Sequence, residues 1–238
     1  MTLLTLVQQH CRINGLNVPN GVVASADATV IQLLALLNEL VEDLTDQSKF
    51  QGFTREATHT LTAAEDQGTI ASIADEGFLY IYPGTFWDRT RTIEIGGPLN
   101  EREWQERKAI PMTGTYYCYR FRENNLLINP APTAGALSDV AFEYASSYGV
   151  VAAAGTFKAT FTLDTDTFAL PEKILRKGLT WKWKYQKGLA YQLEEQQYWD
   201  MLNNAIARDK GLRPVNLNGN TSEGFRPSVT IPYWNTVP

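Results

Sequence analysis

Residues 162–191 read TLDTDTFALPEKILRKGLTWKWKYQKGLAY, and this stretch marks the change from a β-rich segment to a helical one. Pro171 suits the first helical turn, where its missing N–H costs no hydrogen bond, and Glu172 suits the positive end of the helix dipole. On a helical wheel, basic residues line one side and apolar residues the other. The basic line contains Lys173, Lys177, Lys184 and Lys187, with Arg176 beside it. The apolar side contains Ile174, Leu175, Gly178, Trp181 and Tyr185, and it is interrupted by Lys182. We predict a helix with one face for a core and one for a charged neighbour.

The first 50 residues also have a helical pattern. A short helix is expected from Leu3 to about Asn14, with Gly15 as its C-terminal stop. A longer helix is expected to about Asp46, capped by Asp27 or Ser25. Its apolar stripe contains Val30, Leu34, Leu37, Val41 and Leu44, flanked by Ile31, Leu33 and Leu40. Because this face is wide enough to be covered on more than one side, the pattern favours a bundle.

Residues 53–162 contain short β-like runs separated by turn residues. The expected strands are Thr54–Leu61, Phe78–Tyr82, Thr85–Trp87, Thr92–Ile95, Tyr116–Arg122, Leu126–Ile128, Asp139–Tyr144 and Lys158–Thr162. A tight hairpin is expected at Glu123-Asn124-Asn125. Asn100, with Glu103 three residues later, has the pattern of a helix capping box. Antiparallel strands of this length and number suggest a small sandwich or barrel.

These segments together predict an α+β protein. The second helical region runs from Pro171 to about Asp209 and is expected to bend at Gly188. The simplest architecture is a helical bundle built from both ends of the chain, residues 1–50 and 168–210, with a β-rich region, residues 51–167, inserted between them. An extended C-terminal arm, residues 211–238, is expected to follow.

The arm is rich in Pro, Gly and Asn and has no helical period. It nevertheless carries large apolar residues that a solvated linker would lack, among them Phe225, Val229, Ile231, Tyr233 and Trp234. We predict that it lies on a neighbouring chain. The alternative is that it folds back on its own domain.

Composition limits the possible classes of protein. The chain has 238 residues, of which 44% are hydrophobic and 11% aromatic, as expected for a globular protein. Its net charge of −5 argues against a surface that grips nucleic acid throughout. No secretory signal pattern and no apolar run of membrane-spanning length is found, so we expect a soluble protein made in a cytoplasm.

The search for chemistry gives no catalytic constellation, and we predict no enzyme activity, metal or cofactor. Cys11 and Cys118 are too few for a disulfide framework and are expected to be free, buried or half-buried thiols. Asp164-x-Asp166 opens like a calcium loop but has Ala169 and Leu175 where that loop needs Gly and Glu, so a polar turn before the helix is expected.

Arg89 and Arg91 flank Trp87 and have two open interpretations. They can bind phosphate, but packing and salt bridges are the commoner roles of such arginines.

Five blocks in order give the chain a resemblance to a known family. They are LLTLVQQHCRINGL (3–16), LLALLNELVEDL (33–44), TFWDRTRTIEIGGPLNEREWQERKA (85–109), GTYYCYRFRENNLLINPAP (114–132) and DTDTFALPEKIL (164–175), followed by the Leu179, Trp181, Trp183 series. In this order and spacing they resemble the head-to-tail adaptor (connector) proteins of short-tailed bacteriophages.

The resemblance implies a structural virion protein at the head–tail junction. It implies a homo-oligomeric, twelvefold ring that docks beneath the portal protein and seats the tail nozzle or tube protein, with a tail fibre protein as a further partner. Genomic DNA would pass through the lumen without specific binding, and no membrane is involved. Two alternatives remain at this stage: a β-sandwich binding module, and a nucleic-acid-binding protein that uses the basic helix at 171–187.

Overall fold

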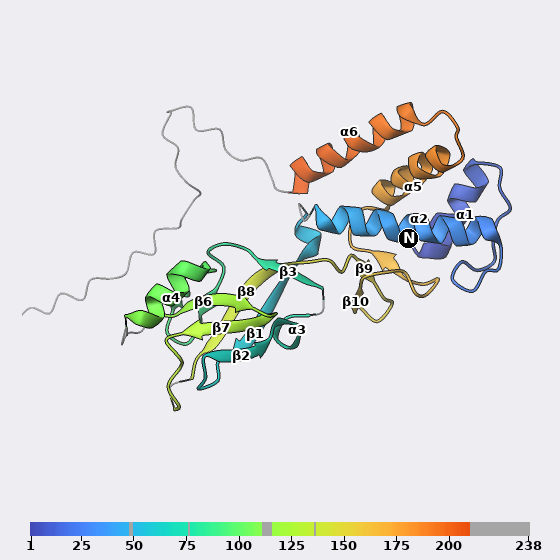
Figure 1. Cartoon of the computed structure of the whole chain (residues 1–238). Helices are drawn as coiled ribbons and strands as arrows, with labels where there is room; N and C mark the ends of the chain where they lie inside the picture. The colour runs from blue at the N-terminus through green and yellow to red at the C-terminus, as the bar shows by residue number, and fades with distance from the viewer. Residues whose placement is uncertain (48–49, 76, 111–115, 136, 210–238) are drawn as a thin grey trace, which may run out of the picture.

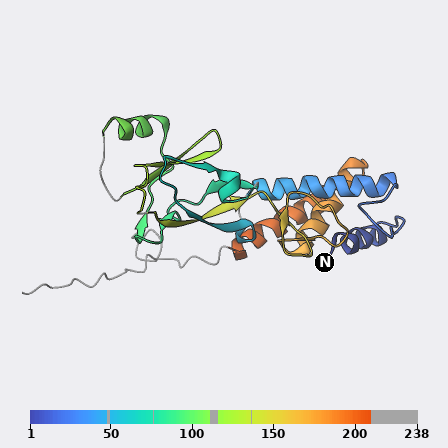
Figure 2. The same cartoon turned by 90° about the horizontal axis from the view of Figure 1, so that it is seen from below.

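The long helices lie at one end of the molecule and most of the strands at the other, as two perpendicular views of a computed structural model show (Figures 1 and 2). The structure describes residues 1–47, 50–75, 77–110, 116–135 and 137–209. The helical end contains both the start and the end of the described chain, and the sheet end is formed by the middle of the chain. The expected α+β class is therefore confirmed.

Four long helices form the helical end: α1 (Leu3–Ile13), α2 (Ala28–Asp46), α5 (Glu172–Gln186) and α6 (Gln192–Asp209). The predicted ends of the first two are confirmed. Gly15 follows α1 with φ +68°, in the left-handed region that favours glycine, and the Asp27 side chain accepts a hydrogen bond from the Thr29 N–H at the start of α2. The predicted stripe on α2 needs one correction, because Leu36 is buried whereas Ile31 is exposed.

The second helical region consists of two helices, where the sequence had suggested one bent helix from Pro171. Pro171 caps α5 from outside, so the helix begins at Glu172. Helix α5 ends at Gln186, and Gly188 has φ +67°, a left-handed conformation that ends the helix instead of bending it. Helix α6 then returns along α5.

Helix α5 is central to the helical core because it packs against α1, α2 and α6. At Gly178 it lies so near α2 that an added Cβ would overlap the methyl groups of Leu40, and this Cβ would also lie 3.1 Å from Cε2 of Tyr198. The core is built from apolar residues of all four helices, including Leu6, Val7, Leu33, Leu37, Leu44, Ile174, Leu179, Trp183 and Leu202. Residues outside these helices also belong to this core, among them Phe50, Phe53, Val150 and Phe161.

The strands form three sheets whose ladders are all antiparallel. The largest has the order β1 (Thr54–Thr60), β8 (Asp139–Ser146), β4 (Trp87–Asp88) and β5 (Ile93–Glu94), with β3 (Phe78–Ile81) also beside β8. The second has the order β2 (Asp66–Thr69), β7 (Asn125–Asn129) and β6 (Cys118–Arg122). Side chains of both sheets share one apolar core, which includes Ala57, Ile81, Tyr119, Leu126, Ile128, Val140 and Phe142. The predicted sandwich-like region is therefore present.

The third sheet belongs to the helical end. It has the order β10 (Phe157–Lys158), β9 (Val150–Val151) and β11 (Thr167–Phe168), and lies beneath α2. Val150 is buried in the helical core, and Phe168 packs against that core.

Local turn and cap signals near the second sheet are confirmed. Glu123 and Asn124 both have positive φ in the two-residue hairpin between β6 and β7, where Arg122 pairs with Asn125. Helix α4 (Glu101–Ala109) begins with the predicted capping box between Asn100 and Glu103. The short elements η1 (Gln51–Phe53) and α3 (Ile70–Ile73) complete the described chain.

Two predicted strands are wrong in part. The strand expected at Thr85–Trp87 is Trp87–Asp88, because the Thr85 hydroxyl donates to the Tyr82 carbonyl oxygen at 2.7 Å and forms a turn. Of the strand expected at Lys158–Thr162, only Lys158 lies in a strand, β10 (Phe157–Lys158). The N–H groups of Thr162 and Leu163 instead donate to the Asp166 carboxylate, at 2.9 and 2.8 Å. Strands β2, β9 and β11 and helix α3 had not been expected.

Among the residues that the structure describes, the chain passes between the two ends of the molecule twice, from α2 to β1 and from β8 to β9. Arg55 fastens the crossings together. Its guanidinium donates to the carbonyl oxygens of Gly52 and Thr54, at 2.8 and 3.0 Å, and to that of Tyr148, at 3.5 Å, and it lies 3.5 Å over the Phe157 ring. In the described chain, no helix is at once long and apolar enough to cross a membrane.

Candidate protein-interaction surface

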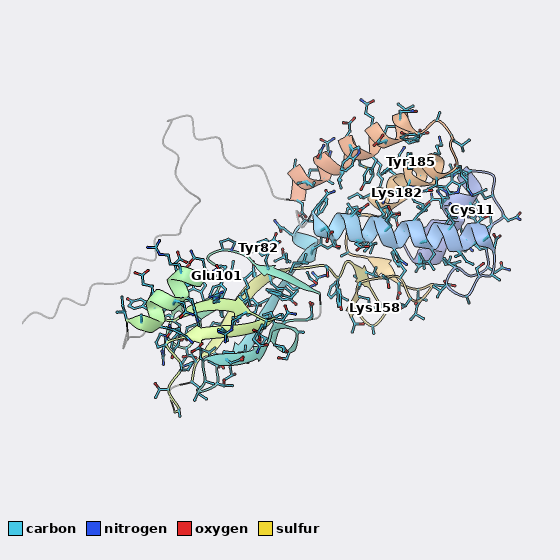
Figure 3. The ribbon with its side chains drawn as sticks, viewed as in Figure 1. Cys11, Tyr82, Glu101, Lys158, Lys182 and Tyr185 are labelled. Carbon is cyan, nitrogen blue, oxygen red and sulfur yellow. The ribbon has the colours of Figure 1, made fainter. Side chains whose placement is uncertain are left out.

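Lys182, the residue that interrupts the apolar side of α5, is buried and paired with α2. Its side chain is 8% exposed, and its Nζ lies 2.7 Å from Glu39 Oε1 and 2.6 Å from Asp43 Oδ2. Figure 3 labels Lys182 among the side chains of the helical end. Burial by itself lowers the pKa of Lys182, but the hydrogen bonds to Asp43 and Glu39 outweigh it, so that the pKa is raised. The lysine that interrupts the apolar side of α5 therefore forms an ion pair between α5 and α2.

A groove of about 630 Å³ surrounds this ion pair and lies between α2, α5 and α6. We call it the anionic groove. Its charged lining residues are Glu39, Asp43, Asp46, Lys182 and Glu195, and its aromatic ones are Trp181, Tyr185, Tyr191, Tyr198 and Trp199. The Tyr185 and Tyr191 rings meet edge to face at the C-terminal end of α5, with centroids 5.1 Å apart.

The predicted basic line of α5 divides into two groups in the structure. Lys177 donates to Gln197 Oε1 at 2.8 Å, and Lys184 forms an ion pair with Glu194, so both contact α6. Lys173, Arg176 and Lys187 form no ion pair with another described residue. We call these three residues the cationic edge.

A second cavity, of about 660 Å³, lies along the other side of α6. Lys173 and Ile174 of α5 line it together with Gln197, Asp200 and Met201 of α6. Lys173 thus lies beside this cavity and away from the anionic groove. The remaining interface residues proposed from the sequence, Phe225, Val229, Ile231, Tyr233 and Trp234, lie outside the described residues.

The two aspartates that resemble a calcium-loop start hold loops in place. The Asp164 carboxylate accepts hydrogen bonds from the N–H groups of Val22 and Val23, at 3.1 and 2.9 Å. Asp166 is fully buried and pairs with Lys158 at 2.7 Å. Burial alone would raise its pKa, but the hydrogen bonds from Lys158, Thr162 and Leu163 outweigh it, and the pKa is lowered. The expected polar turn is therefore a tertiary anchor as well.

Arg89 and Arg91 both make contacts within the chain. Arg89 pairs with Glu56 across the sheet. Arg91 lies 3.9 Å from the Asp88 carboxylate and 4.9 Å from the centre of the Tyr117 ring. The structure thus supports the interpretation that these arginines serve packing and salt bridges, and not the one in which they bind phosphate.

The cysteines and histidines, the side chains that most often bind metals or take part in redox chemistry, are not clustered in the described chain. Cys11 and Cys118 are free and buried, as predicted. Burial raises the pKa of both thiols, although Arg107 partly offsets this at Cys118. His10 and His59 lie at different ends of the molecule. Within the described ranges, no three His, Cys, Asp or Glu residues are placed to hold a metal ion.

Sequence reasoning missed the anionic groove, although part of the signal was present. Glu39 and Asp43 are four residues apart on α2 and therefore lie on one helix face. A lysine in the apolar arc of another helix, together with such a pair, would have predicted contact between the two helices. The aromatic wall was not predictable, because Tyr191 and Trp199 join it only through the reversal of the chain at Gly188.

These features define a class of protein: an α+β protein with an elongated shape and charged, aromatic grooves suited to protein contacts. A sequence model of the family described as SU10 adaptor protein matches residues 1–221. The chain therefore belongs to the SU10 adaptor protein family, and it is a structural adaptor protein of a bacteriophage. The resemblance to head-to-tail adaptors is thereby confirmed. A search of curated proteins found no match.

Proposed function

We propose that this protein forms the head-to-tail adaptor ring that joins the portal to the tail nozzle or tube and lets DNA pass through its lumen. The observation that carries the proposal is the family match over residues 1–221. A twelvefold ring is the symmetry that the resemblance to head-to-tail adaptors implies.

The division of the molecule into two ends supports a joining role. We propose that residues 1–50 and 168–210 form one domain and residues 51–167 an inserted one, with Val150 and Phe161 of the insertion packing on the helical core. Two apolar cores at opposite ends of an elongated chain can contact different neighbours at the same time. A joining protein needs two such ends, one for the head side and one for the tail side.

The charge of the chain suits a channel through which DNA moves. With a net charge of −5, the chain provides little of the phosphate neutralisation on which tight duplex binding depends. Two of the basic residues on α5, Lys177 and Lys184, contact α6 and are less available to a phosphate backbone. A weakly attractive or repulsive wall would let the genome pass without adhering to it.

The proposal is tested on phage particles. Cells infected with phage whose copy of this gene is disrupted should produce heads without attached tails, and electron microscopy of the purified particles would show this. In complete particles, cryo-electron microscopy should place the protein in a ring directly below the portal. Normally tailed particles from the disrupted phage would contradict the proposal.

A binding measurement separates the proposal from the nucleic-acid-binding alternative. The purified chain should bind duplex DNA weakly at physiological salt. Tight binding whose affinity falls steeply with salt, by about one ion per basic residue engaged, would favour the alternative instead.

A further inference from the structure

Carboxylates outnumber cations in the anionic groove. Glu39, Asp43, Asp46 and Glu195 line it beside the single ammonium group of Lys182. That ammonium group already binds Glu39 and Asp43, whereas Asp46 and Glu195 form no ion pair with another described residue. The groove therefore has an excess of negative charge that a cationic partner would neutralise.

The aromatic lining favours the same kind of partner. Tyr185 is 55% exposed and Trp199 41% exposed, although large aromatic side chains are usually mostly buried. The negative faces of tyrosine and tryptophan rings attract lysine and arginine side chains, and arginine in particular stacks on them. Carboxylates next to open aromatic faces form a surface suited to long basic side chains.

The cationic edge is the matching surface on the same chain. Lys173 and Lys187 are exposed and Arg176 is half-buried, and none of the three is paired within the described chain. Lys173 and Arg176 are neighbours on the surface of α5, and Lys187 directly follows the last residue of that helix, so that a single straight contact can engage more than one of them. Arginine also provides the flat guanidinium group that stacks on aromatic rings.

The two surfaces cannot meet within one chain, because they lie on opposite sides of α6. On the wheel of α5, the contact of Trp183 with His10 marks the direction of α1, and the contact of Lys177 with Gln197 marks that of α6. Arg176 lies between these two directions. The ion pair of Lys182 with Glu39 marks the direction of α2 on the same wheel. Trp181 and Tyr185, which line the anionic groove, lie between that direction and the direction of α6. Lys173 lines the second cavity, on the far side of α6 from the anionic groove.

We infer that the anionic groove of one copy binds the cationic edge of a second copy. A contact between two different surfaces of identical chains is heterologous, and repeating it around an axis closes a ring when the rotation allows. The inference deepens the proposed function, on which it rests, by naming the faces that meet between neighbouring copies. Lys177 and Lys184 are outside the contact, since they already contact α6.

Charge reversal with mixing tests the contact. One variant carries Arg176→Glu and Lys187→Glu on the cationic edge, and the other carries Asp46→Lys and Glu195→Lys in the anionic groove. Each variant alone places like charges opposite each other, so its self-association should weaken by about tenfold or more. An equal mixture restores opposite charges at every contact of an alternating ring and should associate like the unmodified chain. Sedimentation at low salt gives the dissociation constant of each variant, of their mixture and of the unmodified chain.

The control matched to the edge variant carries Arg102→Glu and Arg122→Glu, which change the net charge by the same amount but lie at the sheet end of the molecule. It should associate like the unmodified chain. Circular dichroism would show whether all variants fold. Folded edge and groove variants that associate normally, or a mixture no better than its components, would overturn the inference.

Cross-linking gives a second measurement that detects weak encounters. Copies with Arg176→Cys and copies with Glu195→Cys are mixed and treated with a short bismaleimide, to which the buried Cys11 and Cys118 are poorly accessible. Cross-linked pairs should form about tenfold faster than with an Arg102→Cys partner. Equal rates would overturn the inference even if electron microscopy finds the protein below the portal. Absence from the neck, with rapid cross-linking, would instead contradict the proposed function alone.

Discussion

The imidazole of His10 is fully buried in the helical core, where it meets the Trp183 ring edge to face at 5.6 Å between centroids. Asn14 Nδ2 lies 3.3 Å from its Nε2, so the described partners of the ring are neutral. Burial lowers the pKa of His10 from its ordinary value of 6.5 to about 4. The folded protein therefore keeps this imidazole neutral at pH values at which an unfolded chain would protonate it.

This difference predicts acid sensitivity of the helical end. Between pH 6.5 and about 4 the unfolded chain binds a proton at His10 and the folded chain does not, so the free energy of unfolding falls as pH falls. The loss from this group is complete below about pH 4 and amounts to roughly 3 kcal/mol. Urea unfolding at a series of pH values would measure it.

His10→Phe is the matching variant, because it keeps an aromatic ring next to Trp183 and removes the titrating group. Its stability should change less between pH 7 and pH 4.5 than that of the unmodified chain. Equal slopes for the two proteins would show that carboxylates, and not His10, cause the acid loss.

At the scale of elements, the crossing of α5 and α2 depends on the missing side chain of Gly178. An alanine in a helix interior is ordinarily about 1 kcal/mol more favourable than a glycine. At this position its Cβ would overlap both methyl groups of Leu40, which a packed core accommodates only by moving. We therefore expect Gly178→Ala to lower the free energy of unfolding by about 1–3 kcal/mol.

A double-mutant cycle with Leu40→Ala would identify the cause of this loss. Because Leu40→Ala removes the methyl groups that the added Cβ would strike, Gly178→Ala should cost little in that background, or should stabilise it. An undiminished cost in the Leu40→Ala background would place the effect elsewhere, for example at Tyr198.

The elements predicted correctly from the sequence are those specified by neighbouring residues. The Asp27 cap, the capping box of Asn100 and the turn at Glu123 and Asn124 each depend on residues at most three positions apart. The strand expected at Lys158–Thr162 was wrong beyond Lys158, where Asp166, outside the β-like run, accepts the Thr162 N–H that a ladder would need.

The candidate site was predicted less well than the fold. The sequence predicted a line of lysines with Arg176 beside it, but the division of these residues between α6 and solvent depends on a second helix that α5 does not specify. The hydrogen bond from the Val22 N–H to Asp164 joins residues 142 positions apart, so no pattern in the neighbouring sequence predicts it either.

At the scale of the whole molecule, the C-terminal arm is expected to serve attachment more than folding. The arm, residues 211–238, is rich in Pro, Gly and Asn and has no helical period, so we expect it to add little to the apolar cores. Truncation after Gly211 should therefore shift the thermal unfolding midpoint by less than about 2 °C, while weakening attachment to the portal. Scanning calorimetry and co-sedimentation with portal rings would measure the two effects.

Full-length chains with Tyr233→Ala and Trp234→Ala test whether attachment to the portal depends on these apolar side chains of the arm or only on the presence of the arm. They should attach nearly as weakly as the truncated chain. Unfolding of the truncated chain would show that the arm belongs to its own core, and full attachment would show that the arm is dispensable.

The two chain crossings that Arg55 fastens together have a mechanical consequence. A single strand between two bodies acts as a swivel, whereas two strands held side by side resist torsion and leave bending as the easier motion. The bond from Arg55 to the Tyr148 carbonyl oxygen and the pairing of Thr54 with Ala145 hold the strands together where the two ends of the molecule meet. A twisting load applied to the sheet end would thus reach the helical end as torque, whereas a sideways load would be absorbed at the joint.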